Sequence, residues 1–131
     1  MKVATVCLNT HADISANINK TLDYIINAAE KGAQTILVPE MWTGVNAILK
    51  QHEIAENITP QVLNKLSDTA EQLKVNIVAG SLPIIPNPPL GLKVFNRVYV
   101  FDCNGSQVAY YDKRKLFKIT ANSALNTPSL D

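Results

Sequence analysis

The sequence TILVPEMWTG occupies residues 35–44 and predicts both the type of sheet and the place where chemistry would occur. Ile36 to Val38 form a short all-apolar run, which is typical of a parallel strand buried on both faces. Pro39 ends the run because proline has no backbone N–H to donate to a neighbouring strand. The acid Glu40 follows at once, and ligands of open α/β sheets gather beyond the carboxyl ends of the strands. Glu40 is therefore the first candidate site residue.

The residues before this stretch predict a β-α-β unit. Val3 to Leu8 read as a strand, and a helix follows in which apolar residues recur every three or four positions. Asp13 and Ser15 are both suitable caps for its start, and Gly32 is suited to end it in the left-handed conformation. Crossovers of this kind are right-handed in nearly all proteins, so the two strands are expected to be parallel neighbours or near neighbours.

A second helical unit is predicted from residue 59 onward. Thr59 is a good N-cap, Pro60 suits the first helical position, and an apolar stripe continues to Leu73. Between the two units the pattern is weak, which favours a loop with a short helix at Ala47 to His52.

Strands and turns dominate the rest of the chain. Val75 to Ala79 predict a third buried strand, which Gly80 and Ser81 are expected to break. Prolines concentrate between residues 83 and 91, which indicates a surface loop rather than a domain linker because strands continue on both sides.

A hairpin is predicted after that loop. The segments 94–101 and 107–111 are short and rich in β-branched and aromatic residues, and Asn104-Gly105 between them favours a tight turn. The two strands should therefore be antiparallel. A basic run from Lys113 to Lys115 follows, and no clear periodicity is present from Lys118 onward.

Composition limits the classes of function. The chain has 131 residues, of which 47% are hydrophobic and 18% are charged, and this is typical of one soluble globular domain. No segment predicts a membrane span or a secretory signal, so a cytoplasmic location is expected. A net charge of +1 provides no field that would gather nucleic acid or an anionic membrane, so partners are sought among small molecules and proteins.

No cofactor or metal site is predicted. The chain lacks a Gly-rich phosphate loop, so the motifs for dinucleotide and nucleoside-triphosphate binding are absent. Cys7 and His11 lie four positions apart where a strand leaves for a loop, so they do not share a face, and a closed zinc site needs four ligands.

Three stretches in fixed order carry a family resemblance. They are ILVPEMW at 36–42, VNIVAGSLP at 75–83 and VFNRVYVFDCNGSQVAYYDKRKLF at 94–117. Together they resemble the nitrilase superfamily of carbon-nitrogen hydrolases, over a length that corresponds to roughly the first half of that family's catalytic domain. The resemblance implies an α/β fold, namely a partial αββα sandwich of the nitrilase type in which β-α-β units precede an antiparallel hairpin. Residues 1–131 would form a single incomplete domain.

The resemblance also implies a catalytic set for hydrolysis of the C–N bonds of small amides. By motif match Glu40 is the family's general base and Lys113 its lysine, with no metal or cofactor required. The family's nucleophilic cysteine lies beyond the lysine motif, where this sequence has no cysteine, and neither Cys7 nor Cys103 matches that position. The isolated chain is therefore expected to be inactive. Without the resemblance, Glu40 would read equally well as a solvated loop acid and Lys113 as part of a solvated basic turn.

The implied half-domain has consequences for partners. One sheet of a two-sheet sandwich would leave an apolar face and an unpaired strand edge in water, so self-association or a complementing chain is expected. The alternative function is a non-catalytic interaction module that associates with a full-length relative. The substrate is not determined by these residues.

Overall fold

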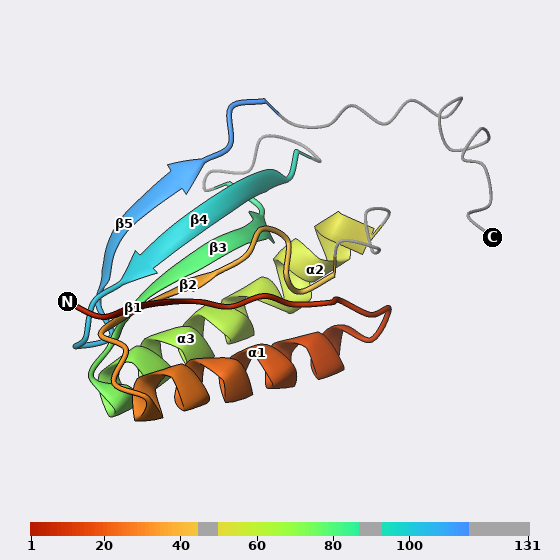
Figure 1. The fold of residues 1–131 in the computed structure, drawn as a ribbon. Coiled ribbons are helices and arrows are strands. Elements are labelled where there is room, and N and C mark those ends of the chain that lie inside the picture. Colours follow the sequence, from red (N-terminus) through yellow and green to blue (C-terminus); the bar gives the residue numbers. More distant parts are fainter. Residues whose placement is uncertain (45–49, 87–92, 116–131) are drawn as a thin grey trace.

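A computed structural model describes residues 1–44, 50–86 and 93–115, which form a mixed five-stranded sheet with helices α1, α2 and α3 (Figure 1). The elements in chain order are β1 (Val3–Thr5), α1 (Ile14–Glu30), β2 (Thr35–Val38), α2 (Gln51–Asn57), α3 (Thr59–Leu73), β3 (Asn76–Ile84), β4 (Phe95–Phe101) and β5 (Gln107–Asp112). This is the expected α/β order of β-α-β units followed by a hairpin.

The strands lie in the sheet in the same order as in the sequence. β1, β2 and β3 are parallel, and β4 runs antiparallel to both β3 and β5. The predicted parallel pairing of the first two strands and the antiparallel pairing of the last two are both confirmed. β1 is shorter than predicted and ends at Thr5, although the backbone N–H of Val6 still donates to Leu37 on β2 at 2.8 Å.

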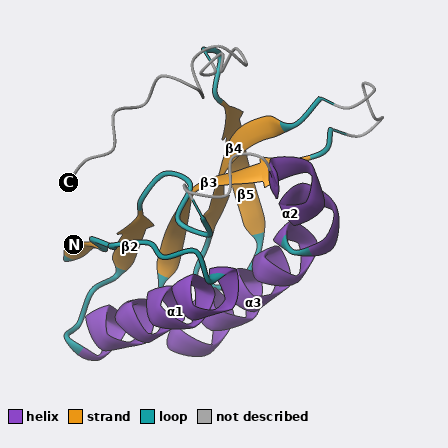
Figure 2. Cartoon of the chain, turned by 90° about the vertical axis from the view of Figure 1, so that its right-hand side faces the viewer, coloured by secondary structure: helices purple, strands orange, loops and turns teal. Residues whose placement is uncertain are grey.

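One face of the sheet carries the core. α1 and α3 lie side by side along this face (Figures 1 and 2). Ile36 on β2 and Ile77 on β3 are fully buried there, together with Ile25 from α1 and Leu66 from α3. Burial of each such side chain stabilises the fold by roughly 1.5–3 kcal/mol, and these residues belong to the hydrophobic core of the described chain.

No described helix or strand covers the opposite face. Because side chains alternate between faces, the strand register places one row of mostly apolar residues across all five strands on this side. The row consists of Thr5, Leu37, Val78, Val100 and Ala109. Tyr111 lies on the same face, opposite Val98, and is 54% exposed. We call this surface the uncovered face.

The helix ends agree with the sequence in one case and not in the other. Asp13 caps α1 as predicted, since its Oδ1 accepts from the N–H of Ala16 at 3.0 Å, and Gly32 has the expected positive φ of 86°. The prediction that Thr59 caps α3 is wrong: Ile58 is the N-cap, and the hydroxyl of Thr59 donates to the carbonyl of Pro83 at 2.7 Å. A tertiary hydrogen bond to β3 has taken the side chain that local capping would have used.

The third strand is longer than predicted. Gly80 and Ser81 do not end it, because β4 continues to pair with β3 as far as Ile84, and a bulge between Ala79 and Leu82 absorbs the change of register. Pro83, which we assigned to the following loop, lies within this strand; residues 87–92 of that loop are outside the described ranges. The short helix predicted at 47–52 is partly outside them too, and α2 begins at Gln51.

At Gly80 the backbone of β3 lies close to the end of β2. A Cβ atom built on Gly80 would lie 1.9 Å from the carbonyl oxygen of Val38 and 2.8 Å from that of Pro39. Both obstacles are backbone atoms, which cannot move away as a flexible side chain could. Only glycine therefore lets the end of β2 fold over β3.

Gly80→Ala is expected to lower the free energy of unfolding by about 2 kcal/mol or more, since overpacking against backbone forces the strands apart. Urea denaturation measures this change. Gly32→Ala is the matched control: its φ is positive, but the nearest atoms to the added Cβ lie at 3.9 Å, so it should cost only the left-handed strain of about 1–2 kcal/mol. A Gly80→Ala variant as stable as wild type would contradict this account of the close approach.

Candidate active site

Glu40 is presented by a tight turn at the end of β2. Met41 has the uncommon φ of +53°, and its backbone N–H donates to both the carbonyl oxygen of Ser81 at 3.0 Å and the Ser81 hydroxyl at 3.2 Å. These bonds hold the turn across β3. Such left-handed geometry in a non-glycine residue is a local strain, and it is kept here by the bonds to Ser81.

The residues after Glu40 are anchored to the helical layer. Trp42 is fully buried and belongs to the hydrophobic core. Its indole N–H has no hydrogen-bond partner in the described ranges. Asn17 of α1, also buried, donates to the carbonyl of Thr43 at 3.0 Å and exchanges two hydrogen bonds with the backbone of His11. The turn is thus fastened at both ends.

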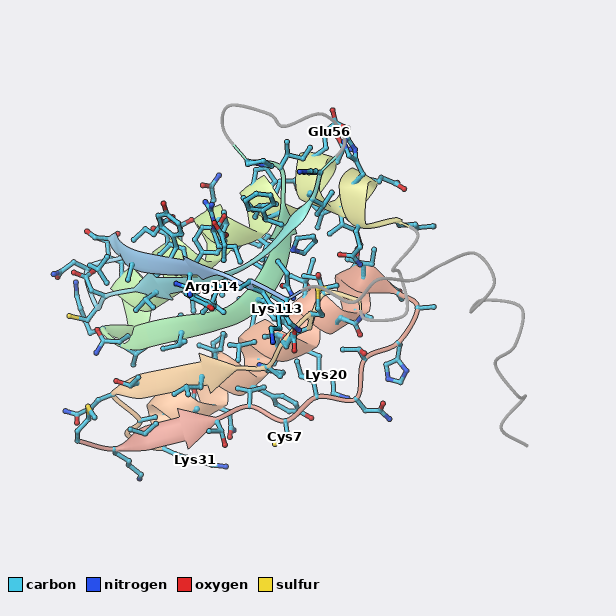
Figure 3. All side chains as sticks on the ribbon, turned by 90° about the horizontal axis from the view of Figure 1, so that it is seen from above. Cys7, Lys20, Lys31, Glu56, Lys113 and Arg114 are labelled. Carbon is cyan, nitrogen blue, oxygen red and sulfur yellow. The ribbon has the colours of Figure 1, made fainter. Side chains whose placement is uncertain are left out.

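Lys113 reaches Glu40 from the edge of the sheet that β5 forms. It follows directly after β5, and its backbone N–H donates to the carbonyl of Asn96 on β4 at 2.9 Å. Its ammonium Nζ donates to Glu40 Oε1 at 2.5 Å. Figure 3 looks onto the uncovered face and shows Lys113 above the sheet. The two residues that the sequence analysis selected, 73 positions apart, therefore lie in direct contact.

Asn96 is a third member of this cluster, and the sequence analysis did not select it. Its side-chain Nδ2 donates to the same oxygen, Oε1 of Glu40, at 2.9 Å. Asn96 stands within the quoted 94–117 stretch, but only the strand register shows that it faces the same side as Lys113. No local pattern in the sequence distinguishes it from an ordinary strand asparagine.

The pair is open to solvent. The side chain of Glu40 is 53% exposed and that of Lys113 is 32% exposed. Exposed ion pairs contribute only about 0.2–1 kcal/mol to stability, so the contact is a poor stabilising device. Its carboxylate and ammonium are accessible to a small molecule on the uncovered face.

A second ion pair sets the register just before Lys113. Arg97 and Asp112 are cross-strand neighbours, and the guanidinium makes two hydrogen bonds to the carboxylate, at 2.6 and 2.8 Å. The Arg97 guanidinium also lies 4.1 Å from the centre of the Tyr110 ring. Its hydrogen bonds to Asp112 raise the pKa of Arg97 further above its usual value. This cluster lies on the helix side of the sheet and holds the end of β5 against β4.

The two cysteines lie away from the pair. Cys7 is exposed beyond the end of β1, and Figure 3 shows it at the β1 edge of the sheet, apart from Lys113. Cys103 belongs to the β4–β5 turn, where its backbone N–H donates to the side chain of Asn76 at 3.1 Å.

Within the described ranges, His, Cys, Asp and Glu form no group of three or more arranged to hold a metal ion. In those same ranges no helix combines the length and apolar character of a membrane span.

Tyr99 provides a pH-dependent probe of this part of the sheet. Burial raises its pKa above 10, and the nearby charge of Arg97 opposes that effect without cancelling it. The folded state therefore keeps a proton that the unfolded chain loses, so this contribution to stability is present below pH 10 and is lost as the pH rises through the folded-state value. The free energy of unfolding should fall less steeply above pH 10 in Tyr99→Phe than in wild type, as measured by urea denaturation at several pH values. Tyr24→Phe controls for loss of an exposed phenol, and equal slopes in Tyr99→Phe and wild type would refute the assignment.

Known proteins resemble this chain in sequence. Residues 2–129 match the family model described as carbon-nitrogen hydrolase. The omega-amidase NIT2 of Homo sapiens is 30% identical over 118 residues, which cover 90% of this chain and 41% of that protein. The 2-oxoglutaramate amidase of Bacillus subtilis is 30% identical over 122 residues, which cover 91% of this chain and 45% of that protein.

Solved structures resemble it in fold. An amidase from Nesterenkonia sp. superimposes with a TM-score of 0.72 at 21% identity, over 91% of this chain and 44% of that one. A mutant of the same amidase in complex with butyramide gives the same TM-score. The chain thus spans less than half the length of these relatives. Because the family model matches nearly all of it, the chain belongs to the carbon-nitrogen hydrolases of the nitrilase superfamily.

Proposed function

We propose that this chain supplies Glu40 and Lys113 to an active site that hydrolyses the C–N bond of small amides. The observation that supports the proposal most directly is the contact between Glu40 Oε1 and Lys113 Nζ at 2.5 Å. It joins the ends of β2 and β5, which are not neighbours in the sheet, and it places a proton acceptor beside a fixed positive charge. The amidases among the relatives support the choice of substrate class.

Each residue type suits one part of this chemistry. A thiolate attacks the carbonyl carbon of the amide, and the oxygen that gains negative charge is stabilised by the Lys113 ammonium. Glu40 takes the thiol proton and delivers it to the leaving nitrogen as the C–N bond breaks. Glu40 then removes a proton from water, which attacks the thioester. The sulfur leaves as the acid is released, and Glu40 returns the proton to it to regenerate the thiol.

The nucleophilic sulfur must come from polypeptide outside these 131 residues. The sequence contains only Cys7 and Cys103, of which the first lies beyond the end of β1 and the second in the β4–β5 turn. Glu40 and Lys113 lie on the uncovered face, so a layer that packs on this face would bring its own side chains to the open carboxylate. Covering the face and completing the site are therefore one event in this proposal.

A chimera tests the catalytic roles. Residues 1–115 of this chain would be joined in frame to the corresponding remainder of the human omega-amidase, and ammonia release from a small amide such as butyramide would be measured. Glu40→Gln and Lys113→Met should each lower the rate by at least about 10³-fold, as removal of one member of a catalytic set does in other enzymes. Glu53→Gln, at an exposed acid on α2, is the matched control and should retain activity.

The same assay defines the contrary result. The isolated 131-residue chain should release ammonia only at the background rate, because it lacks the nucleophile. Normal turnover by that chain, or full activity of the chimera with Gln at position 40, would exclude the proposed roles.

The uncovered face gives a specific basis for the alternative function, a non-catalytic module that associates with a full-length relative. In that case the chain would purify with the relative, and Glu40→Ala in this chain would leave the activity of the complex unchanged. Loss of activity of the complex with Glu40→Ala would instead support the catalytic role.

Association through the uncovered face is also expected for the chain alone. An apolar row across five strands is unfavourable in water, so sedimentation velocity should show oligomers. Tyr111→Lys places a charge on this face and should shift the distribution toward the monomer, whereas Val108→Lys, at a residue 58% exposed on the helix side, should not. A stable wild-type monomer would count against the expectation.

A further inference from the structure

We propose that Asn96 is a positioning residue that holds the Glu40 carboxylate against Lys113. It hydrogen-bonds to both members of the pair. Its side-chain Nδ2 donates to Glu40 Oε1 at 2.9 Å, and its backbone carbonyl accepts from the N–H of Lys113 at 2.9 Å. The geometric part of this inference stands without any assumed activity, and its consequence for catalysis rests on the proposed function.

The sheet explains how Asn96 reaches a residue two strands away. β3 lies between β2 and β4, so the turn that carries Glu40 has to cross β3, and the missing side chain of Gly80 permits this crossing. Pro83 on β3 pairs with Asn96 on β4, and Lys113 follows on β5. The side chains of Asn96 and Lys113 therefore leave the same face, next to each other, where Glu40 arrives.

The chemistry of the amide determines its orientation. A carboxylate oxygen only accepts hydrogen bonds, so the NH₂ group of Asn96 must face Glu40. The Asn96 Oδ1 atom then points away and is buried, with no hydrogen-bond partner in the described ranges. A buried acceptor without a partner destabilises a fold. The unpaired Oδ1 of Asn96 therefore lowers the stability of the fold. In return, its Nδ2 donates a hydrogen bond to the Glu40 carboxylate.

Because the unpaired Oδ1 destabilises the fold, substitutions of Asn96 can distinguish a positioning role from a structural one. Asn96→Leu removes the donor and also the unsatisfied acceptor, so the variant should be at least as stable as wild type while Glu40 loses its support. Asn96→Asp keeps the shape but replaces the donor with an acceptor that repels the Glu40 carboxylate. A residue that merely stabilised the strand would lose stability in the Asn96→Leu variant.

Zero-length crosslinking of the 131-residue chain measures the pair directly. A carbodiimide activates the carboxylate, and attack by the Lys113 amine forms an amide whose peptide is quantified by mass spectrometry. The exposure of both side chains makes them accessible to the reagent. We expect the Glu40–Lys113 crosslink to fall by roughly threefold or more in Asn96→Leu and Asn96→Asp, since a hydrogen bond to a charged group is lost. Asn19→Leu and Asn19→Asp, at an exposed position on α1, are the matched controls and should leave it unchanged.

Urea midpoints measured in parallel decide between the interpretations. A lower crosslink yield in Asn96→Leu at an unchanged or higher midpoint supports the positioning role. An unchanged yield in both variants overturns it, and so does a lower yield that occurs only together with a lower midpoint in both. Because crosslinking does not require turnover, an inactive chimera with an Asn96-dependent crosslink would refute the proposed function and leave this inference standing.

Discussion

The close approach of β2 to β3 at Gly80 is the constraint on which the rest of the candidate site depends. With no side chain there, the carbonyl oxygens of Val38 and Pro39 lie where a Cβ atom would otherwise be. The chain leaving β2 can then fold over β3 instead of continuing past it. Met41 adopts a left-handed conformation to complete the turn, and Ser81 holds it with two hydrogen bonds. Glu40 is carried toward β4 and β5 as a result.

The turn that carries Glu40 contacts three strands or their ends, namely Ser81 on β3, Asn96 on β4 and Lys113 after β5. The hairpin contributes through its register, which the Arg97–Asp112 ion pair holds on the helix side, one residue before Lys113 leaves on the opposite side. The fold therefore separates its tasks: the buried layer beneath the helices stabilises the sheet, and the uncovered face carries the exposed carboxylate and ammonium. A surface ion pair adds little to stability, so the contact between Glu40 and Lys113 contributes little to the free energy of folding.

Several local predictions from the sequence were correct because short-range physics decided them. The all-apolar run at 36–38 formed a parallel strand, Asp13 capped α1, and the 94–111 pattern formed an antiparallel hairpin. The predicted burial of the run on both faces is wrong for Leu37, which is 36% exposed because no described element covers its face of the sheet. The other errors share one cause, which is that a tertiary contact outweighed a local preference. Thr59 bonds to β3 instead of capping α3, and Gly80 continues a strand that its composition was expected to end, because β4 supplies pairing partners beyond it.

The sequence by itself determined the family, the order of the elements and the two charged residues of the candidate site, since these depend on residue types and spacings along the chain. Only the tertiary structure decided that Glu40 and Lys113 touch, that Asn96 joins them and that all three lie on the face without a helical layer. The physical reason is that contacts across a sheet depend on strand register and on a close backbone approach. Both arise from the packing of distant segments, and neither is encoded within any one of them.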